Sequence, residues 1–116
     1  MKVCLVGVNY SETPVGIREK LTISSPQLQD ALLLLHNYVS QGVILSTCNR
    51  IEVYTVTDKD SSPESTAIPF LKAWANLSDA DLLPYTYIYQ DEAAIRHLFC
   101  VASGLDSMII GEYEIL

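Results

Sequence analysis

The chain has 116 residues, 49% of them hydrophobic, and a formal net charge of −7. This length suits one domain with a modest core. The charge excludes broad, non-specific binding of nucleic acid, because contacts to phosphates need Lys and Arg, and the seven basic residues are scattered along the chain.

The hydrophobic residues form no membrane segment. The longest apolar run is far shorter than the roughly 18 residues that cross a bilayer, and the N-terminus lacks the features of a secretory signal. Cys4, Cys48 and Cys100 are too few and too far apart for a disulfide framework or a structural zinc site. We therefore expect a cytoplasmic protein with reduced thiols, no membrane association and no bound metal.

The first half of the chain alternates between strand and helix patterns. Its apolar spacing predicts a strand, two helices and two further strands, over residues 2–9, 15–21, 27–39, 43–46 and 51–57. The second helix has the clearest start, because Ser24 and Ser25 precede Pro26, and Pro is favoured in a first helical turn. A turn or bulge at 47–50 joins the last two strands.

The second half predicts helices over 67–75 and 78–83, a strand over 85–89 and a helix over 92–103. Asp91 is expected to cap that last helix and Gly104 to end it. Residues 107–116 resemble the start of a further helix, which would link this single domain, 1–116, to another part of a longer protein. The order of elements predicts an α+β fold, a ferredoxin-like split β-α-β sandwich whose antiparallel sheet carries its helices on one face.

One stretch at the predicted turn indicates a catalytic role for a cysteine. Cys48 lies between two strand-like runs and close to Arg50. A fixed positive charge favours the thiolate, which is the nucleophilic form of cysteine. Cys4 and Cys100 lie in apolar surroundings and are interpreted as small buried hydrophobic residues. The pattern alone leaves two interpretations of Arg50 open, a substrate-binding group and a surface arginine paired with Glu52.

Three blocks of the sequence resemble the N-terminal catalytic domain of the glutamyl-tRNA reductase family. They are Gly7-Val8-Asn9 with Pro14-Val15 and 18–21, the stretch 45–54, and 97–99 with 101–112. The resemblance implies an oxidoreductase that reduces glutamyl-tRNA to glutamate-1-semialdehyde with NADPH, the first step of the five-carbon route to 5-aminolevulinate and tetrapyrroles. It also implies a homodimer formed through a C-terminal domain, and glutamate-1-semialdehyde aminomutase as a partner. No Gly-x-Gly-x-x-Gly loop for NADPH occurs in the sequence, so we expect only the acyl-transfer half of the reaction here.

The resemblance also assigns roles to individual residues. Cys48 would attack the aminoacyl ester and form a glutamyl thioester, and Arg50 would bind the substrate carboxylate with its planar fork. Thr47 and Asn49 would orient the substrate, and His97 would assist proton transfer or shape the pocket. The remaining substrate-binding positions are Ser107, Glu112, Tyr113 and Glu114.

Two departures from the family pattern concern substrate binding. Tyr113 and Glu114 stand where the family usually has Pro and Gln, and an added negative charge would oppose the substrate carboxylate unless it points away. These changes motivate an alternative, a catalytically silent domain that binds tRNA or a regulator. A third interpretation, a thiol hydrolase unrelated to tRNA, needs Cys48 and His97 to meet in space.

Overall fold

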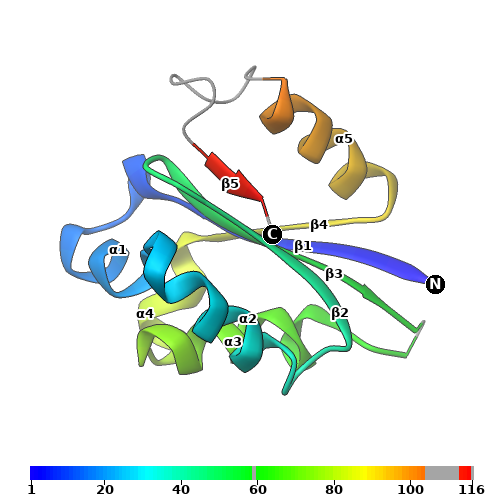
Figure 1. The fold of residues 1–116 in the computed structure, drawn as a ribbon, viewed down its shortest axis with the longest axis horizontal. Helices are drawn as coiled ribbons and strands as arrows, with labels where there is room; N and C mark the ends of the chain where they lie inside the picture. The colour runs from blue at the N-terminus through cyan, green and yellow to red at the C-terminus, as the bar shows by residue number, and fades with distance from the viewer. Residues whose placement is uncertain (59, 104–112, 116) are drawn as a thin grey trace.

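A computed structural model describes residues 1–58, 60–103 and the backbone of 113–115. Its centre is an antiparallel sheet in the order β4-β1-β3-β2-β5 (Figure 1). The strands are β1 (Lys2–Asn9), β2 (Gln41–Thr47), β3 (Arg50–Thr57), β4 (Thr86–Gln90) and β5 (Tyr113–Ile115). The first four strands have the ferredoxin-like arrangement, in which β1 and β3 lie side by side in the middle. The predicted α+β sandwich is confirmed.

Helices cover both faces of the sheet, rather than the one face predicted from the sequence. One face carries α1 (Val15–Leu21), α2 (Leu28–Leu35), α3 (Ala67–Ala75) and the short α4 (Asp79–Leu82), and the other carries α5 (Glu92–Ala102) (Figure 1). The order of elements constrains which strands pair, but it does not say on which face a final helix packs. None of the described helices is long and apolar enough to span a membrane.

The face that carries α1 to α4 holds the main core. Phe70 and Leu71 of α3 and Leu21 of α1 are fully buried in one cluster with Ile51 and Val53 of β3. Burying such side chains contributes roughly 1.5–3 kcal/mol each. The α5 face has a smaller apolar cluster, made of Leu5, Leu45, Tyr54, Ala94 and Val101.

Asp91 does not cap α5 in the way predicted. It has a positive φ of 51°, and its side chain makes no capping hydrogen bond. Its carboxylate instead accepts a 3.1 Å bond from the backbone N–H of Val3, while its own N–H donates to the Val3 carbonyl at 2.7 Å. Asp91 therefore extends the pairing of β1 with β4 before the chain turns into α5.

The helix predicted over 107–116 is not found where the structure describes this stretch. Tyr113–Ile115 forms β5, an antiparallel neighbour of β2 in which Ile115 lies opposite Leu45. The edge of β2 offers backbone N–H and C=O groups with which a further strand can pair. The spacing of apolar residues within 107–116 carries no information about this distant edge. Gly104, Ser107 and Glu112 lie outside the described residues.

Candidate active site

The tip of the β2–β3 hairpin presents Cys48. The hydroxyl of Thr47 accepts hydrogen bonds from the backbone N–H groups of Asn49 and Arg50, both at 3.0 Å. The carbonyl of Asn49 accepts a 2.9 Å bond from the N–H of Tyr10, which ties the tip to the end of β1. Thr47 and Asn49 therefore fix the turn on which the exposed side chain of Cys48 stands.

Arg50 begins β3 and is almost completely buried. Side chains alternate between the two faces of a strand, so Ile51 and Val53 join the main core while Glu52 and Tyr54 face α5. Arg50 shares the α5 face with Glu52, with exposed fractions of 5% for Arg50 and 0% for Glu52. The interpretation of Arg50 as a surface residue is therefore wrong.

Glu52 is the centre of a buried hydrogen-bond network. The hydroxyl of Tyr54 donates to its Oε1 at 2.6 Å, the hydroxyl of Tyr87 donates to its Oε2 at 2.5 Å, and Nε2 of His97 lies 2.5 Å from the same Oε2. A carboxylate accepts hydrogen bonds and does not donate them, so the tautomer of His97 that suits this pair is the one with its proton on Nε2. Glu52 thereby fixes the ring of His97, which faces the sheet from α5.

A glycine makes room for this network. Gly7 of β1 lies opposite Glu52 on one side and Tyr87 on the other. A β-carbon at position 7 would lie 2.5 Å from the ring of Tyr87, far inside contact distance. The ring of Tyr87 therefore crosses over Gly7 to reach Glu52, which only a residue without a side chain allows.

The surroundings keep the two tyrosine hydroxyls protonated. Burial, followed by the hydrogen bond and the charge of Glu52, raises the pKa of Tyr54 far above its usual range. Burial and the charge of Glu52 do the same to the pKa of Tyr87. Both groups can therefore donate to Glu52 at all physiological pH values.

Two polar cavities flank the hairpin tip. The first, which we call the arginine cavity, has a volume of about 290 Å³ and is lined by Asn9, Glu12, Arg50, Tyr87, Tyr89 and His97. The second, the hydroxyl cavity, has a volume of about 270 Å³ and is lined by Thr22, Ser24, Ser25, Ser46 and Thr47 together with Ile23 and Cys48. Cys48 and His97 thus line different cavities, one toward the α1–α2 connection and one toward α5.

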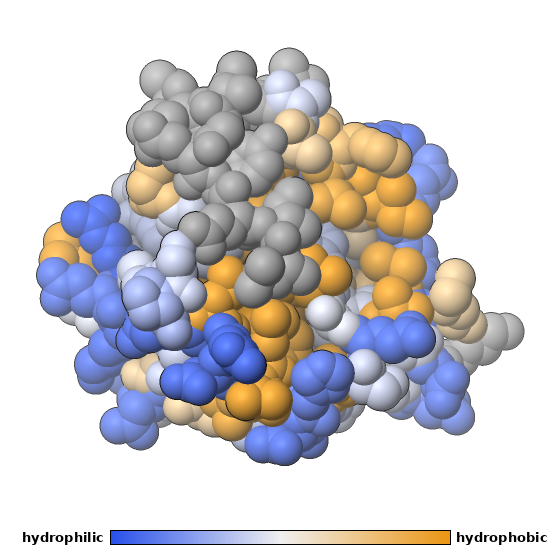
Figure 2. Space-filling model, in the orientation of Figure 1, coloured by the Kyte–Doolittle hydropathy of each residue, from blue (hydrophilic) through white to orange (hydrophobic). Residues whose placement is uncertain are grey.

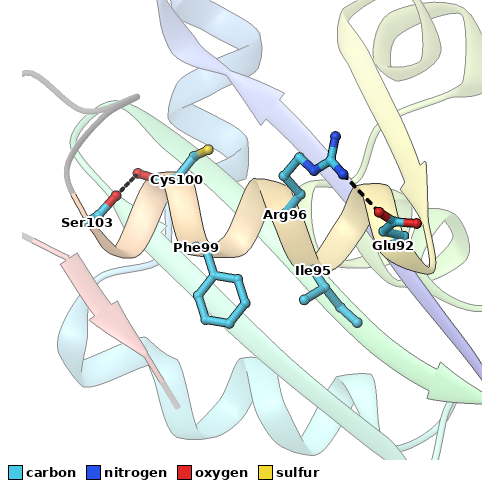
Figure 3. Close-up of a pocket in the computed structure, with 6 residues that line it drawn as sticks. All are labelled: Glu92, Ile95, Arg96, Phe99, Cys100 and Ser103. Carbon is cyan, nitrogen blue, oxygen red and sulfur yellow. Dashed lines mark hydrogen bonds and ion pairs between the residues drawn. The ribbon is translucent and has the colours of Figure 1, made fainter.

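A third cavity runs along the outer side of α5 (Figure 3). It has a volume of about 500 Å³, and Ile95 and Phe99 project on one side of the helix, with Arg96 on the other paired to Glu92 at 2.8 Å. Ile95 and Phe99 are exposed, and hydrophobic residues gather over α5 in Figure 2. This groove is apolar and lies apart from Cys48, although the half-buried Cys100 lines it.

The remaining predicted residues divide into two groups. The backbones of Tyr113 and Glu114 pair with those of Thr47 and Ser46, which places this segment beside the hairpin that carries Cys48. Ser107 and Glu112 lie outside the described residues. The substrate contacts expected of all four stay predictions.

Sequence reasoning missed Glu52, Tyr54 and Tyr87 as parts of the site. A signal was present in the alternation of β3, where Arg50, Glu52 and Tyr54 share one face while Ile51 and Val53 share the other. A charged residue between two core positions of a strand needs a buried partner. That partner, His97, comes from an element 45 positions away, which periodicity cannot supply.

Comparison with known proteins shows what this chain is similar to. A family model described as "Glutamyl-tRNAGlu reductase, N-terminal domain" matches residues 6–116. Over its whole length the chain is 45% identical to the glutamyl-tRNA reductase of Roseiflexus castenholzii and 48% identical to that of Carboxydothermus hydrogenoformans, of which it covers 27% and 26%. A solved structure, glutamyl-tRNA reductase from Methanopyrus kandleri, matches 95% of the chain with a TM-score of 0.61 and 28% identity, over 24% of its own length.

The chain therefore spans about a quarter of the length of the curated relatives that it matches. The family model covers nearly all of it, and the solved structure matches its fold. The chain belongs to the glutamyl-tRNA reductase family and corresponds to its N-terminal domain.

Proposed function

We propose that the chain carries the acyl-transfer part of a glutamyl-tRNA reductase, an oxidoreductase of tetrapyrrole synthesis. The observation that supports this most is the hairpin tip, where an exposed thiol at Cys48 stands two residues from the buried guanidinium of Arg50. A nucleophile and a carboxylate-binding group on one rigid turn are what transfer of a glutamyl group requires.

In the proposed reaction, the thiolate of Cys48 attacks the carbonyl carbon of the ester that joins glutamate to tRNA. The bond from that carbon to the ribose oxygen breaks, the ribose oxygen takes up a proton, and the glutamyl group stays on Cys48 as a thioester. A thioester is a good acceptor for a later hydride.

The arginine cavity suits the glutamyl group. The planar fork of Arg50 can hold a carboxylate through two hydrogen bonds, and Glu12 in the same cavity offers an opposite charge for an ammonium group. Such a site separates glutamate from glutamine, because only a charged carboxylate can accept two charge-assisted hydrogen bonds from the guanidinium fork.

The geometry favours one of the two roles predicted for His97. Its ring lies in the arginine cavity beside Tyr87 and Tyr89, with centroid distances of 5.5 and 5.1 Å, and Glu52 holds its Nε2. Since Cys48 lines the other cavity, His97 shapes the substrate pocket in this proposal. The same separation weakens the interpretation as a Cys48–His97 thiol hydrolase.

The described residues do not fit NADPH. All neighbouring strands among them are antiparallel, so the sheet has no crevice at the carboxyl ends of parallel strands, where dinucleotides bind. The space over Gly7 is filled by the ring of Tyr87. Reduction with NADPH, the homodimer, the aminomutase partner and the cytoplasmic location stay predictions for the full-length protein.

Radiolabelled glutamyl-tRNA tests the proposal. We expect the protein to take up label that survives acid and is released by hydroxylamine, as a thioester is, and to lose at least about 1,000-fold of this activity in Cys48→Ser because a hydroxyl is a far weaker nucleophile. The half-buried Cys100 offers a matched control, and Cys100→Ser should acylate normally. If both variants and the unmodified protein match the uncatalysed rate, the silent binding domain is the correct function.

A further inference from the structure

We infer that the hydroxyl cavity binds the terminal ribose of the tRNA, on the leaving-group side of the ester. This inference rests on the proposed acyl transfer, because an ester attacked by Cys48 has an acyl side and an alcohol side that leave the reacting carbon in different directions. Arg50 and the arginine cavity lie on the α5 side of the hairpin tip. The hydroxyl cavity, which Cys48 itself lines, lies on the other side and is the space left for the alcohol.

The hydrogen bonds of the cavity define what it can bind. The hydroxyl of Thr47 donates to the Arg50 carbonyl at 3.4 Å and accepts from two backbone N–H groups, so it is fully used. Three other hydroxyl groups of the cavity also donate their protons to oxygen atoms of the protein. The hydroxyl of Thr22 donates to the carbonyl of Arg18 at 2.8 Å, and that of Ser24 donates to Oε1 of Gln27 at 2.9 Å. The hydroxyl of Ser46 donates to the carbonyl of Ile23 at 3.0 Å. A hydroxyl has one proton and two lone pairs, so these groups offer acceptors to a ligand. A ligand that brings donors, such as the free hydroxyl of an acylated ribose, complements them.

The lack of charge in the cavity argues against binding of the phosphates or the glutamyl carboxylate of the substrate. None of its lining residues is charged, whereas a phosphate needs Lys or Arg and the glutamyl carboxylate has Arg50. The volume of about 270 Å³ lies just below the range of roughly 300–1,000 Å³ for small-molecule sites. These limits suit one sugar rather than a phosphodiester segment.

The cavity is also fixed relative to the nucleophile. The hydrogen bond from Ser46 to the carbonyl of Ile23 joins β2, one residue from the turn, to the connection between α1 and α2. On the same turn, Thr47 holds the backbone after Cys48. A ribose seated against Ser24 and Ser25 would therefore keep its ester at a constant distance from the thiol, which is the advantage of a positioned substrate.

The test compares two acyl donors on the full-length protein. One donor is glutamyl-tRNA, and the other is the benzyl thioester of the α-carboxyl of glutamate, which has the same acyl group but no ribose. The quantity measured is the ratio of the two rate constants for acylation of Cys48. Ser25→Trp, which fills the cavity, should lower this ratio at least about 10-fold, and Thr22→Val should lower it about 3- to 5-fold, the effect of one net hydrogen bond.

Two controls accompany these variants. Ser40→Ala removes an exposed hydroxyl just before the start of β2. Because a strand rises about 3.3 Å per residue, this position lies roughly 20 Å from the tip, and the change should leave the ratio unchanged. Arg50→Lys alters the acyl side and should slow both donors together, so that their ratio stays constant. Circular dichroism spectra that match the unmodified protein would confirm that each variant is folded.

The possible results separate the inference from the function on which it rests. A ratio that does not move in Ser25→Trp, or a variant that slows both donors equally, would overturn the ribose site while leaving acyl transfer in place. Failure of both donors to acylate the unmodified protein would overturn the proposed function, and the ribose site with it.

Discussion

The two faces of the sheet use the same backbone for different purposes. The face under α1 to α4 buries an apolar cluster around Phe70 and Leu71. The face under α5 buries less apolar surface and instead encloses Glu52 with its donors Tyr54, Tyr87 and His97. A buried carboxylate is costly to desolvate unless its partners are all in place, so the first face supplies most of the apolar burial and the second holds a polar network that depends on all of its members.

The hairpin tip is where the two faces meet. Ser46 makes its hydrogen bond on the side of the main core, and Arg50 lies on the side of α5. Cys48 belongs to the turn that joins these two residues and lines the hydroxyl cavity. Variants on each face should therefore separate effects on folding from effects on acylation.

Phe70→Ala should have the largest effect on stability. Phe70 is fully buried in the main core, and removing such a ring costs about 3–5 kcal/mol. Denaturant unfolding measures the loss. Acylation of Cys48 by glutamyl-tRNA, measured where the variant is folded, should stay normal, and a matching loss of rate would show that the two faces are not separate.

Glu52→Gln should cost about 2–4 kcal/mol, because the amide that replaces the carboxylate places a donor against groups that themselves donate. Unlike Phe70→Ala, it should also slow acylation, since His97 loses its fixed partner. Thr55→Val is the matched control on the same strand. The buried hydroxyl of Thr55 has no hydrogen-bond partner in the described part of the chain, so its removal should leave both stability and rate intact or raise stability slightly.

Gly7→Ala should cost about 1–3 kcal/mol as an overpacked site. The added β-carbon meets the ring of Tyr87 at 2.5 Å and must displace it from Glu52. In a Tyr87→Ala background the same change should cost much less, and a double-mutant cycle measures the coupling. If Gly7→Ala lowered the free energy of unfolding equally in both backgrounds, contact with Tyr87 would not be the reason for a glycine at position 7.

Alkaline titration should have no effect on stability at neutral pH and should lower stability only above about pH 10. Burial raises the pKa of Tyr10 to about 12, while an unfolded tyrosine loses its proton near pH 10. The folded state therefore holds this proton over a range in which the unfolded state has lost it, so the free energy of unfolding falls as pH rises from about 10 to 12. Urea unfolding at several pH values should show a shallower fall in Tyr10→Phe, and identical slopes would contradict the shift.

The sequence predicted elements whose patterns are local. β1, α1 and α3 begin and end at the residues expected, because continuous apolar runs and helical spacing are properties of neighbouring positions. The second helix was predicted to reach Val39 but ends at Leu35, after which turns lead into β2. Val39 is nevertheless buried in the main core. Its helical spacing therefore correctly indicated a buried side chain, although the residue lies outside the helix.

Features that depend on distant contacts could not be predicted in the same way. Asp91 suits a helix cap by type, yet the nearby backbone of Val3 takes its carboxylate. The pairing of Glu52 with His97 and the placement of α5 on the second face both arise from packing between separate elements. Cys48 and Arg50 were predicted from their own stretch of sequence, and their roles stay predictions, whereas the buried network around Glu52 needed the folded chain.

Mass spectrometry of the acid-quenched protein after a single turnover with glutamyl-tRNA would locate the acyl group. We expect a glutamyl adduct on the peptide that contains Cys48, lost in Cys48→Ser and kept in Cys100→Ser. An adduct on Cys100 or Cys4, or glutamate release that continues at the full rate in Cys48→Ser, would contradict this expectation.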